Sequence, residues 1–185
     1  MIDEASQRWL SAHARHALAC ALGCDDRVPA PGPMPDDGAL HTPARVFVSW
    51  HEHGRLLGCI GTLVAGTSLA DAVAHYAVQS GLHDPRMPAM RAEQVAGAEL
   101  EISVLSPPRE LDVRGRSAIE AAIVPGRDGV ILHEGTRRAV FLPVVWAQLP
   151  GVSAFITALC KKAGIDPQRA ADLRAEVFTT QAWTA

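Results

Sequence analysis

The sequence predicts an α+β fold, in which antiparallel β-hairpins pack with helices. Two stretches, 45–63 and 129–142, each combine two β-rich segments with a short turn between them. The helical patterns lie apart from these hairpins instead of alternating one for one with strands, which disfavours a parallel βαβ sheet. With 185 residues, of which 48% are hydrophobic, the chain is long enough to bury a core as a single domain over 1–185.

The first element expected is a helix over residues 6–22. Small and apolar side chains recur there at helical spacing, and Gly23 stops the pattern. Residues 24–43 predict a loop, because prolines occur there at short intervals. The other elements belong to a body that runs from 45 to 185 and carries the recognisable motifs.

The register of the first hairpin, 45–63, follows from a two-residue turn at its tip. Counting back from that turn, Val48 opposes Cys59, and opposed residues share one face of a sheet. Cys59 is therefore expected beside Val48 and Leu57, on the face opposite His51. A slip of one residue would instead bring Cys59 and His51 to the same face.

The rest of the body follows from similar patterns. Apolar and polar residues alternate over 99–106, which predicts a strand that two prolines close. The remaining expected elements are helices over 69–80, 117–123 and 153–163, strands over 129–133 and 138–142, and a last strand over 175–179.

Composition excludes several classes of protein. Lys and Arg total 17 and Asp and Glu total 20, so the net charge of −3 disfavours binding of nucleic acid or anionic membranes through net charge. No apolar stretch reaches the roughly 18 residues of a membrane span, and the N-terminus has acids where a secretory signal has bases. The protein is therefore expected to be cytoplasmic, with its four cysteines as reduced thiols. The lack of a C-x-x-C pair rules out a zinc ribbon or a thioredoxin-type motif.

Histidines suggest a metal site at two places, and neither is favoured. His51 and His53 are two residues apart, but His53 falls in the expected turn. The segment 13–24 carries two histidines and two cysteines at helical spacing, which are interpreted as surface histidines and packing cysteines. We expect no metal and no cofactor, since nucleotide-binding glycine motifs are also missing from the sequence.

The segment Leu56–Leu63, with sequence LLGCIGTL, resembles the signature octapeptide of the AMMECR-one domain family, also called AmmeMemoRadiSam system protein A. The family signature has an arginine where this chain has Leu57. Further matches follow in the family's order: Asp84-Pro85-Arg86, 100–107, 128–131, Phe141-Leu142-Pro143 with Val145-Trp146, 159–164 and Val177-Phe178. The resemblance covers the chain from about Arg45 onward.

The resemblance implies an α+β fold with a larger and a smaller subdomain and a cleft between them. Family genes often lie beside genes for a Memo-type protein, related to extradiol dioxygenases, and for a radical S-adenosylmethionine protein. These two proteins are the partners that the resemblance implies. It implies no settled biochemical activity.

Cys59 is the first candidate catalytic residue, as a nucleophilic or ligand-binding thiol between Gly58 and Gly61. The alternative is a small buried hydrophobic residue in a tight strand. Glu101 is the second candidate, as a general base if it is buried near Cys59, and otherwise it belongs to the wet face of a half-covered sheet. Ser103 projects from the same face as Glu101.

The candidate ligand-binding residues are Gly58, Gly61, Thr62, Ser103 and Arg86. An arginine at position 57 would lie beside the cysteine and could stabilise a thiolate. Leu57 cannot do so, and the charge is therefore either lost or relocated to Arg55 or Arg86. The Asp84-Pro85-Arg86 motif is interpreted as a rigid turn with a local ion pair in preference to a substrate clamp.

Two functions follow from these residues. The first is an enzyme, or enzyme subunit, that acts on a small polar metabolite in a cleft around Cys59. The second is a non-catalytic interaction module that docks a Memo-type or radical S-adenosylmethionine protein. A thiol with polar, open surroundings favours the enzyme, and a thiol sealed in apolar packing favours the module.

Overall fold

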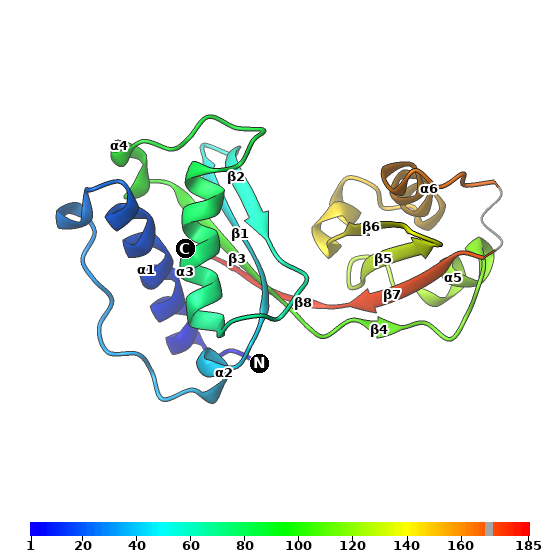
Figure 1. Cartoon of the computed structure of the whole chain (residues 1–185), viewed down its shortest axis with the longest axis horizontal. Coiled ribbons are helices and arrows are strands. Elements are labelled where there is room, and N and C mark those ends of the chain that lie inside the picture. The colour runs from blue at the N-terminus through cyan, green and yellow to red at the C-terminus, as the bar shows by residue number, and fades with distance from the viewer. Residues whose placement is uncertain (169–171) are drawn as a thin grey trace. The chain divides into compact units, whose positions relative to one another are not determined.

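The computed structural model describes residues 1–168 and 172–185, and the chain divides into two compact units. The larger unit comprises Met1–Leu105 and Gln181–Ala185, and the smaller unit comprises Ser106–Thr180. Each unit combines helices with an antiparallel sheet, which confirms the predicted α+β class (Figure 1). Among the described residues, no helix is long and apolar enough to cross a membrane.

The larger unit has a four-stranded sheet with strand order β2-β1-β3-β8. Its strands are β1 (Arg45–Glu52), β2 (Arg55–Gly61), β3 (Glu99–Leu105) and β8 (Thr180–Thr184). Its helices are α1 (Glu4–Ala21), α2 (Gly38–His41), α3 (Leu69–Leu82) and α4 (Ala92–Val95), with a 3-10 turn, η1 (Asp25–Arg27). The helix 6–22, the first hairpin and the helix 69–80 are therefore confirmed within two residues at each end.

One face of this sheet forms the core of the larger unit. Val46, Val48 and Trp50 alternate along β1 and are fully buried, because every second side chain of a strand points to the same face. The helices α1 and α3 lie side by side and cover this face (Figure 1). The Trp50 indole donates a hydrogen bond to the Ala77 carbonyl of α3 at 3.0 Å, so the N–H group of the buried ring has a partner.

The segment 24–43, expected to be a loop, contains the short elements η1 and α2. Its prolines prevent a long helix, but Asp37 accepts a hydrogen bond from the Ala39 N–H and caps the short helix α2. Asp37 also accepts a hydrogen bond from the Ser6 hydroxyl, and the Trp9 indole donates to the Gly32 carbonyl. These bonds attach the segment to α1.

The strand β8 completes the larger sheet beside β3. Leu100 and Ala185 exchange two backbone hydrogen bonds of 2.9 Å, and the Trp183 indole donates to the Ser11 hydroxyl on α1. The last strand was expected to end at residue 179, and β8 was not predicted because its sequence, TQAWT, has only one large apolar residue.

The smaller unit has a second four-stranded sheet with order β4-β7-β5-β6. Its strands are β4 (Arg109–Glu110), β5 (Gly129–Glu134), β6 (Arg137–Phe141) and β7 (Arg174–Phe178), and its helices are α5 (Arg116–Ala122), α6 (Val152–Ala163) and a 3-10 helix, η2 (Pro143–Ala147). The predicted second hairpin is confirmed as β5 and β6.

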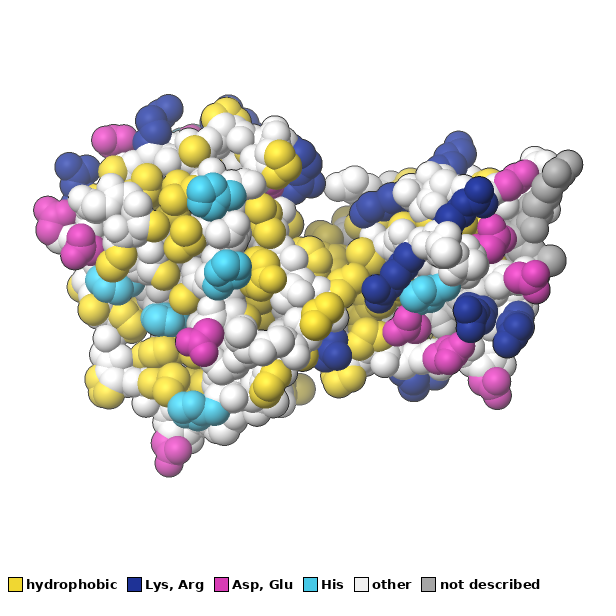
Figure 2. Space-filling view, viewed as in Figure 1, with side chains coloured by type: hydrophobic (Ala, Val, Ile, Leu, Met, Phe, Trp, Pro, Cys, Tyr) yellow, Lys and Arg dark blue, Asp and Glu magenta, His cyan; other side chains and the backbone are white. Residues whose placement is uncertain are grey.

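Helix α6 supplies the core of the smaller unit. One stripe of the helix, made of Phe155, Ile156, Leu159 and Cys160, is fully buried, and Trp146 of η2 stacks on Phe155 at a ring separation of 3.7 Å. Burial raises the pKa of the Cys160 thiol in the same stripe. On the visible surface of this unit, basic and acidic side chains are interspersed, whereas histidines gather on the visible helical face of the larger unit (Figure 2).

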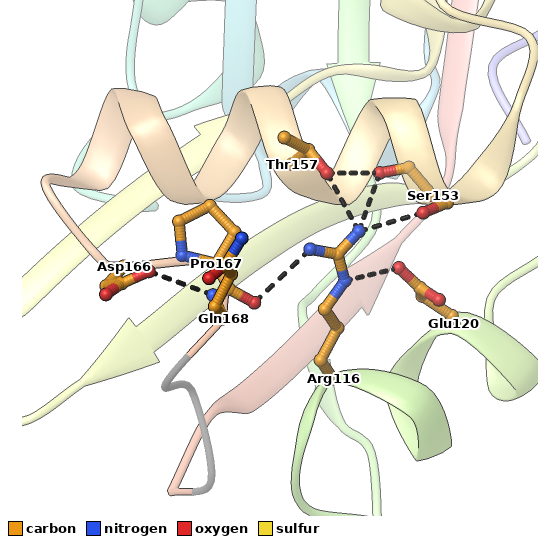
Figure 3. Close-up of polar contacts among 7 residues, drawn as sticks. All are labelled: Arg116, Glu120, Ser153, Thr157, Asp166, Pro167 and Gln168. Carbon is orange, nitrogen blue, oxygen red and sulfur yellow. Dashed lines mark hydrogen bonds and ion pairs between the residues drawn. The ribbon is translucent and has the colours of Figure 1, made fainter.

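Arg116 joins three segments of the smaller unit (Figure 3). Its guanidinium forms an ion pair of 2.7 Å with Glu120 on α5 and donates to the Ser153 and Thr157 hydroxyls on α6, both at 2.8 Å. It also donates to the Pro167 carbonyl at 3.2 Å. Only an arginine has enough donors in one plane to reach all these acceptors.

Replacing Arg116 with alanine is expected to destabilise the smaller unit by about 2 kcal/mol, because several partly buried acceptors lose a charged donor. Hydrogen–deuterium exchange should show faster exchange in α5 and α6 and unchanged exchange in α1 and α3. Arg137→Ala is the matched control, since Arg137 is exposed and contacts Glu134 at only 3.6 Å. Equal effects of the two substitutions would contradict the role given to Arg116.

Candidate functional site

A β-bulge in the first hairpin decides where Cys59 points. The pairs nearest the turn, such as His51 with Leu56, agree with the expected register. The register then shifts between Trp50 and His51, so that Cys59 pairs with Ser49 instead of Val48. The expected register was wrong beyond the bulge, because one extra residue of β2 is accommodated there.

The bulge separates Leu57 from Cys59. Leu57 is 7% exposed and belongs to the hydrophobic core of the larger unit, as does Trp50. Cys59 is half-buried and shares the opposite face of the sheet with Ser49 and His51. The expectation that position 57 lies beside Cys59 on one face is therefore wrong, and Cys59 has the polar neighbours that favour a functional thiol.

Cys59, Ser49 and Glu101 form a row across three strands. Ser49 pairs with Cys59 on β2 and with Glu101 on β3, so the three residues are at the same level of the sheet. Opposed residues in antiparallel strands are about 5 Å apart, so about 10 Å separate the Cα atoms of Cys59 and Glu101. We call these three residues the polar row. Because Ser49 lies between them, Glu101 is placed to act on a molecule bound along the row and not on the thiol directly.

The next row of the same face contains two more candidate residues. Phe47 pairs with Gly61 on β2 and with Ser103 on β3. Ser103 is buried and Glu101 is half-buried. The structure therefore brings four of the candidate residues, Cys59, Gly61, Glu101 and Ser103, to one face of the larger sheet.

Asp84 and Arg86 hold the backbone of Cys59 from the segment that follows α3. The Asp84 carboxylate accepts the Cys59 N–H at 2.9 Å, and the Arg86 guanidinium donates to the Cys59 carbonyl at 2.8 Å. The two side chains are joined by an ion pair of 2.7 Å. We call this arrangement the Asp84–Arg86 bracket. The expected local ion pair is present, and it serves to fix the strand residue that carries the thiol.

The bracket combines a buried charge with an exposed one. The Asp84 side chain is 2% exposed, and its hydrogen bonds from Arg86 and Cys59 hold its pKa well below the usual value. The Arg86 side chain is 61% exposed; Asp84, and to a lesser degree Cys59, raise its pKa. Arg86 thus places a positive charge beside Cys59. This is the charge that the family signature has at position 57, where this chain has leucine. The other arginine considered for this role, Arg55, pairs instead with Glu52 at the hairpin tip.

The glycines around Cys59 allow close backbone packing. A Cβ on Gly58 would lie 1.8 Å from the Ser80 carbonyl oxygen of α3, and a Cβ on Gly61 would lie 2.2 Å from the Val46 carbonyl oxygen. Such distances leave no room for any side chain. The structure therefore explains both glycines by packing, independently of a ligand.

Thr62 follows β2 directly and lines a hollow of about 530 Å³ in the larger unit. The other lining residues are Val64, Gly66, Thr67, Asp71, His75 and Tyr76. The Thr62 hydroxyl accepts the Val64 N–H at 3.0 Å, so it also shapes the turn after the strand. Because Thr62 follows Gly61 directly, it lies at the end of β2 beside the row that contains Gly61 and Ser103.

The donor set suits a small organic ligand. No group of three His, Cys, Asp or Glu side chains that could hold a metal ion is found in residues 1–168 and 172–185. The polar row offers a thiol, a hydroxyl and a carboxylate along one line, and the Arg86 guanidinium is bonded to the Cys59 carbonyl. This set can bind and react with a small polar molecule.

Ser49 and Asp84 contact or adjoin Cys59 but were not among the expected site residues, since Asp84 was expected only in a rigid turn with a local ion pair. Ser49 had a usable signal, since it is a polar residue within an otherwise apolar run of β1. Asp84 had its place before Arg86 in the matched motif, but its bond to the Cys59 N–H joins residues 25 positions apart. Contacts at this separation depend on the packing of α3 against β2, which the local pattern does not reveal.

Comparison with known proteins agrees with the motifs. The AMMECR1 family model matches residues 11–183. A protein of Methanothermobacter thermautotrophicus is 31% identical over 176 residues, which cover 95% of this chain and 91% of that protein. The crystal structure of the uncharacterized protein PH0010 from Pyrococcus horikoshii is similar at a TM-score of 0.84 and 26% identity, covering 99% of this chain and 93% of that one. The chain belongs to the AMMECR1 family.

Proposed function

We propose that the protein is an enzyme, or an enzyme subunit, that binds a small polar metabolite along the polar row, with Cys59 as its nucleophile. The β-bulge carries this proposal, because it turns the thiol away from the core and toward Ser49 and Glu101. Bulges cost regular strand pairing and are frequent beside active sites, where they re-aim a side chain.

The spacing of the polar row suggests the size of the ligand. A molecule that contacts both Cys59 and Glu101 spans the width of three strands, about 10 Å between Cα atoms. Arg86 adds a positive charge at the Cys59 end, which favours an anionic group there. Glu101 at the other end then serves as a base or as an acceptor for a donor group of the ligand.

Metabolite capture tests the proposal. The full chain is immobilised under reducing conditions and exposed to the small-molecule fraction of a cell extract, and retained compounds are identified by mass spectrometry. We expect at least one compound whose retention falls tenfold or more with Cys59→Ala and with Glu101→Gln. Glu93→Gln is the matched control, since Glu93 is exposed on helix α4, outside the polar row.

Conversion of a retained compound by the wild-type chain, and not by Cys59→Ala, would establish catalysis. If no compound depends on Cys59, the proposal is wrong and the non-catalytic module replaces it. That alternative is tested by co-purification with a Memo-type protein and a radical S-adenosylmethionine protein, the partners proposed from the family resemblance.

A further inference from the structure

Helix α1 carries a cysteine–histidine pair that is remote in sequence from the polar row. The Cys20 Sγ lies 3.4 Å from the His16 Nε2, within hydrogen-bond distance for sulfur. The two residues are one turn apart and therefore share a face of the helix. Neither residue takes part in the site around Cys59.

The hydrogen bonds of His16 define its tautomer. Its Nδ1 lies 2.9 Å from the Val28 carbonyl oxygen, which can only accept a hydrogen bond. Nδ1 therefore carries the proton, and the lone pair of Nε2 faces the Cys20 thiol. Val28 is 6% exposed and follows η1, so the carbonyl that orients the ring is itself fixed.

Access distinguishes Cys20 from the other three cysteines. Cys24 and Cys160 are buried, Cys59 is half-buried, and Cys20 is exposed. A nucleophile, a base within hydrogen-bond distance and a third group that orients the base together form the arrangement that activates cysteine in enzymes. In this chain these three parts are Cys20, His16 and the Val28 carbonyl, and the nucleophile is open to solvent.

We propose that Cys20, with His16 as its base, is a site of reversible thiol–disulfide exchange with low-molecular-weight disulfides. The thiol proton moves to His16 Nε2, and the Cys20 sulfur attacks one sulfur of the disulfide. A new S–S bond forms as the old one breaks, and the departing thiolate takes the proton from Nε2. The products are a mixed disulfide at Cys20 and one free thiol, and excess thiol reverses the reaction.

The test uses glutathione disulfide and the full, freshly reduced chain at neutral pH. The position and rate of adduct formation are followed by peptide mass spectrometry. The key variant is His16→Asn, because an asparagine amide can still donate to the Val28 carbonyl but cannot act as a base at the Nε2 position. His13→Asn is the matched control, since His13 stacks on Trp9 on the same helix.

We expect Cys20 to form the adduct before the other cysteines, with a rate about tenfold lower in His16→Asn. The His13→Asn rate should stay within about twofold of wild type. Circular dichroism establishes that α1 is intact in each variant. Equal rates for wild type and His16→Asn would overturn the role of His16, and faster modification of another cysteine would overturn the site. Failure of Cys20 or His16 in this test does not overturn metabolite binding at Cys59.

Discussion

Replacement of Gly58 with alanine is expected to destabilise the larger unit by about 3 kcal/mol or more. The new Cβ would lie 1.8 Å from the Ser80 carbonyl oxygen and 2.9 Å from its carbon. Both are backbone atoms of α3, so no side-chain rotation relieves the overlap. Strand β2 and α3 must move apart, which opens the core around Trp50.

Gly97→Ala is the matched control for this prediction. Gly97 has no atom within 4 Å of its would-be Cβ and does not have a positive φ. We expect its stability to change by less than about 0.5 kcal/mol. The two variants are compared by thermal unfolding and, separately, by hydrogen exchange of α3 and β2. A Gly58→Ala protein as stable as the control would show that β2 and α3 are not in close backbone contact.

Asp84→Asn is expected to cost about 3 kcal/mol of stability, although it hardly changes the shape of the side chain. Each carboxylate oxygen of Asp84 accepts two hydrogen bonds, from Arg86 alone at Oδ1 and from Arg86 and Cys59 at Oδ2. An asparagine amide turns one of these acceptors into a donor that faces two other donors. It also leaves the Arg86 charge without its buried partner.

The pH dependence gives this prediction a second readout. Folding lowers the pKa of Asp84 below its ordinary value of 3.8, chiefly through the hydrogen bonds from Arg86. The stabilisation is therefore fully present well above pH 3.8 and is lost as the pH falls below that value toward the folded pKa. The difference in unfolding free energy between wild type and Asp84→Asn should be constant near neutral pH and should shrink below about pH 4.

Asp128→Asn provides the control in the smaller unit. Asp128 is 2% exposed and is paired with Arg127 at 2.7 Å, so its substitution should also destabilise its unit. It should leave compounds captured through Cys59 unaffected, whereas Asp84→Asn should weaken their capture. Equal loss of capture in the two variants would contradict a specific role of the Asp84–Arg86 bracket at the site.

Local patterns were sufficient to predict most of the secondary structure. The alternation along 99–106 and the apolar stripe of 153–163 each reflect one buried face, and the structure has β3 and α6 there. Short elements were missed because each depends on a few long-range bonds. Helix α2 is held by Asp37 and Ser6, and β8 is held by its pairing with β3.

The sequence supplied several residues that the structure brings to one face, but not the geometry that joins them. Cys59, Glu101 and Ser103 are on one face, as a functional site requires, yet the counted register places Cys59 on the other. The two consecutive leucines before Gly58 break the alternation of β2 and were the only local sign of the bulge. Whether an extra residue is accommodated there depends on the core, which takes up Leu57.

The strand β8 imposes an order on the folding of the chain during synthesis. The smaller unit is one continuous segment, whereas the larger unit needs residues from both sides of it. On the ribosome, residues 1–105 emerge first, but Leu100 lacks its partner, Ala185, until 80 further residues have been translated. The exposed edge of β3 is an aggregation risk during this interval. The entropy cost of closing a loop grows only slowly with its length. The smaller unit, inserted between β3 and β8, therefore delays folding of the larger unit more than it weakens the finished fold.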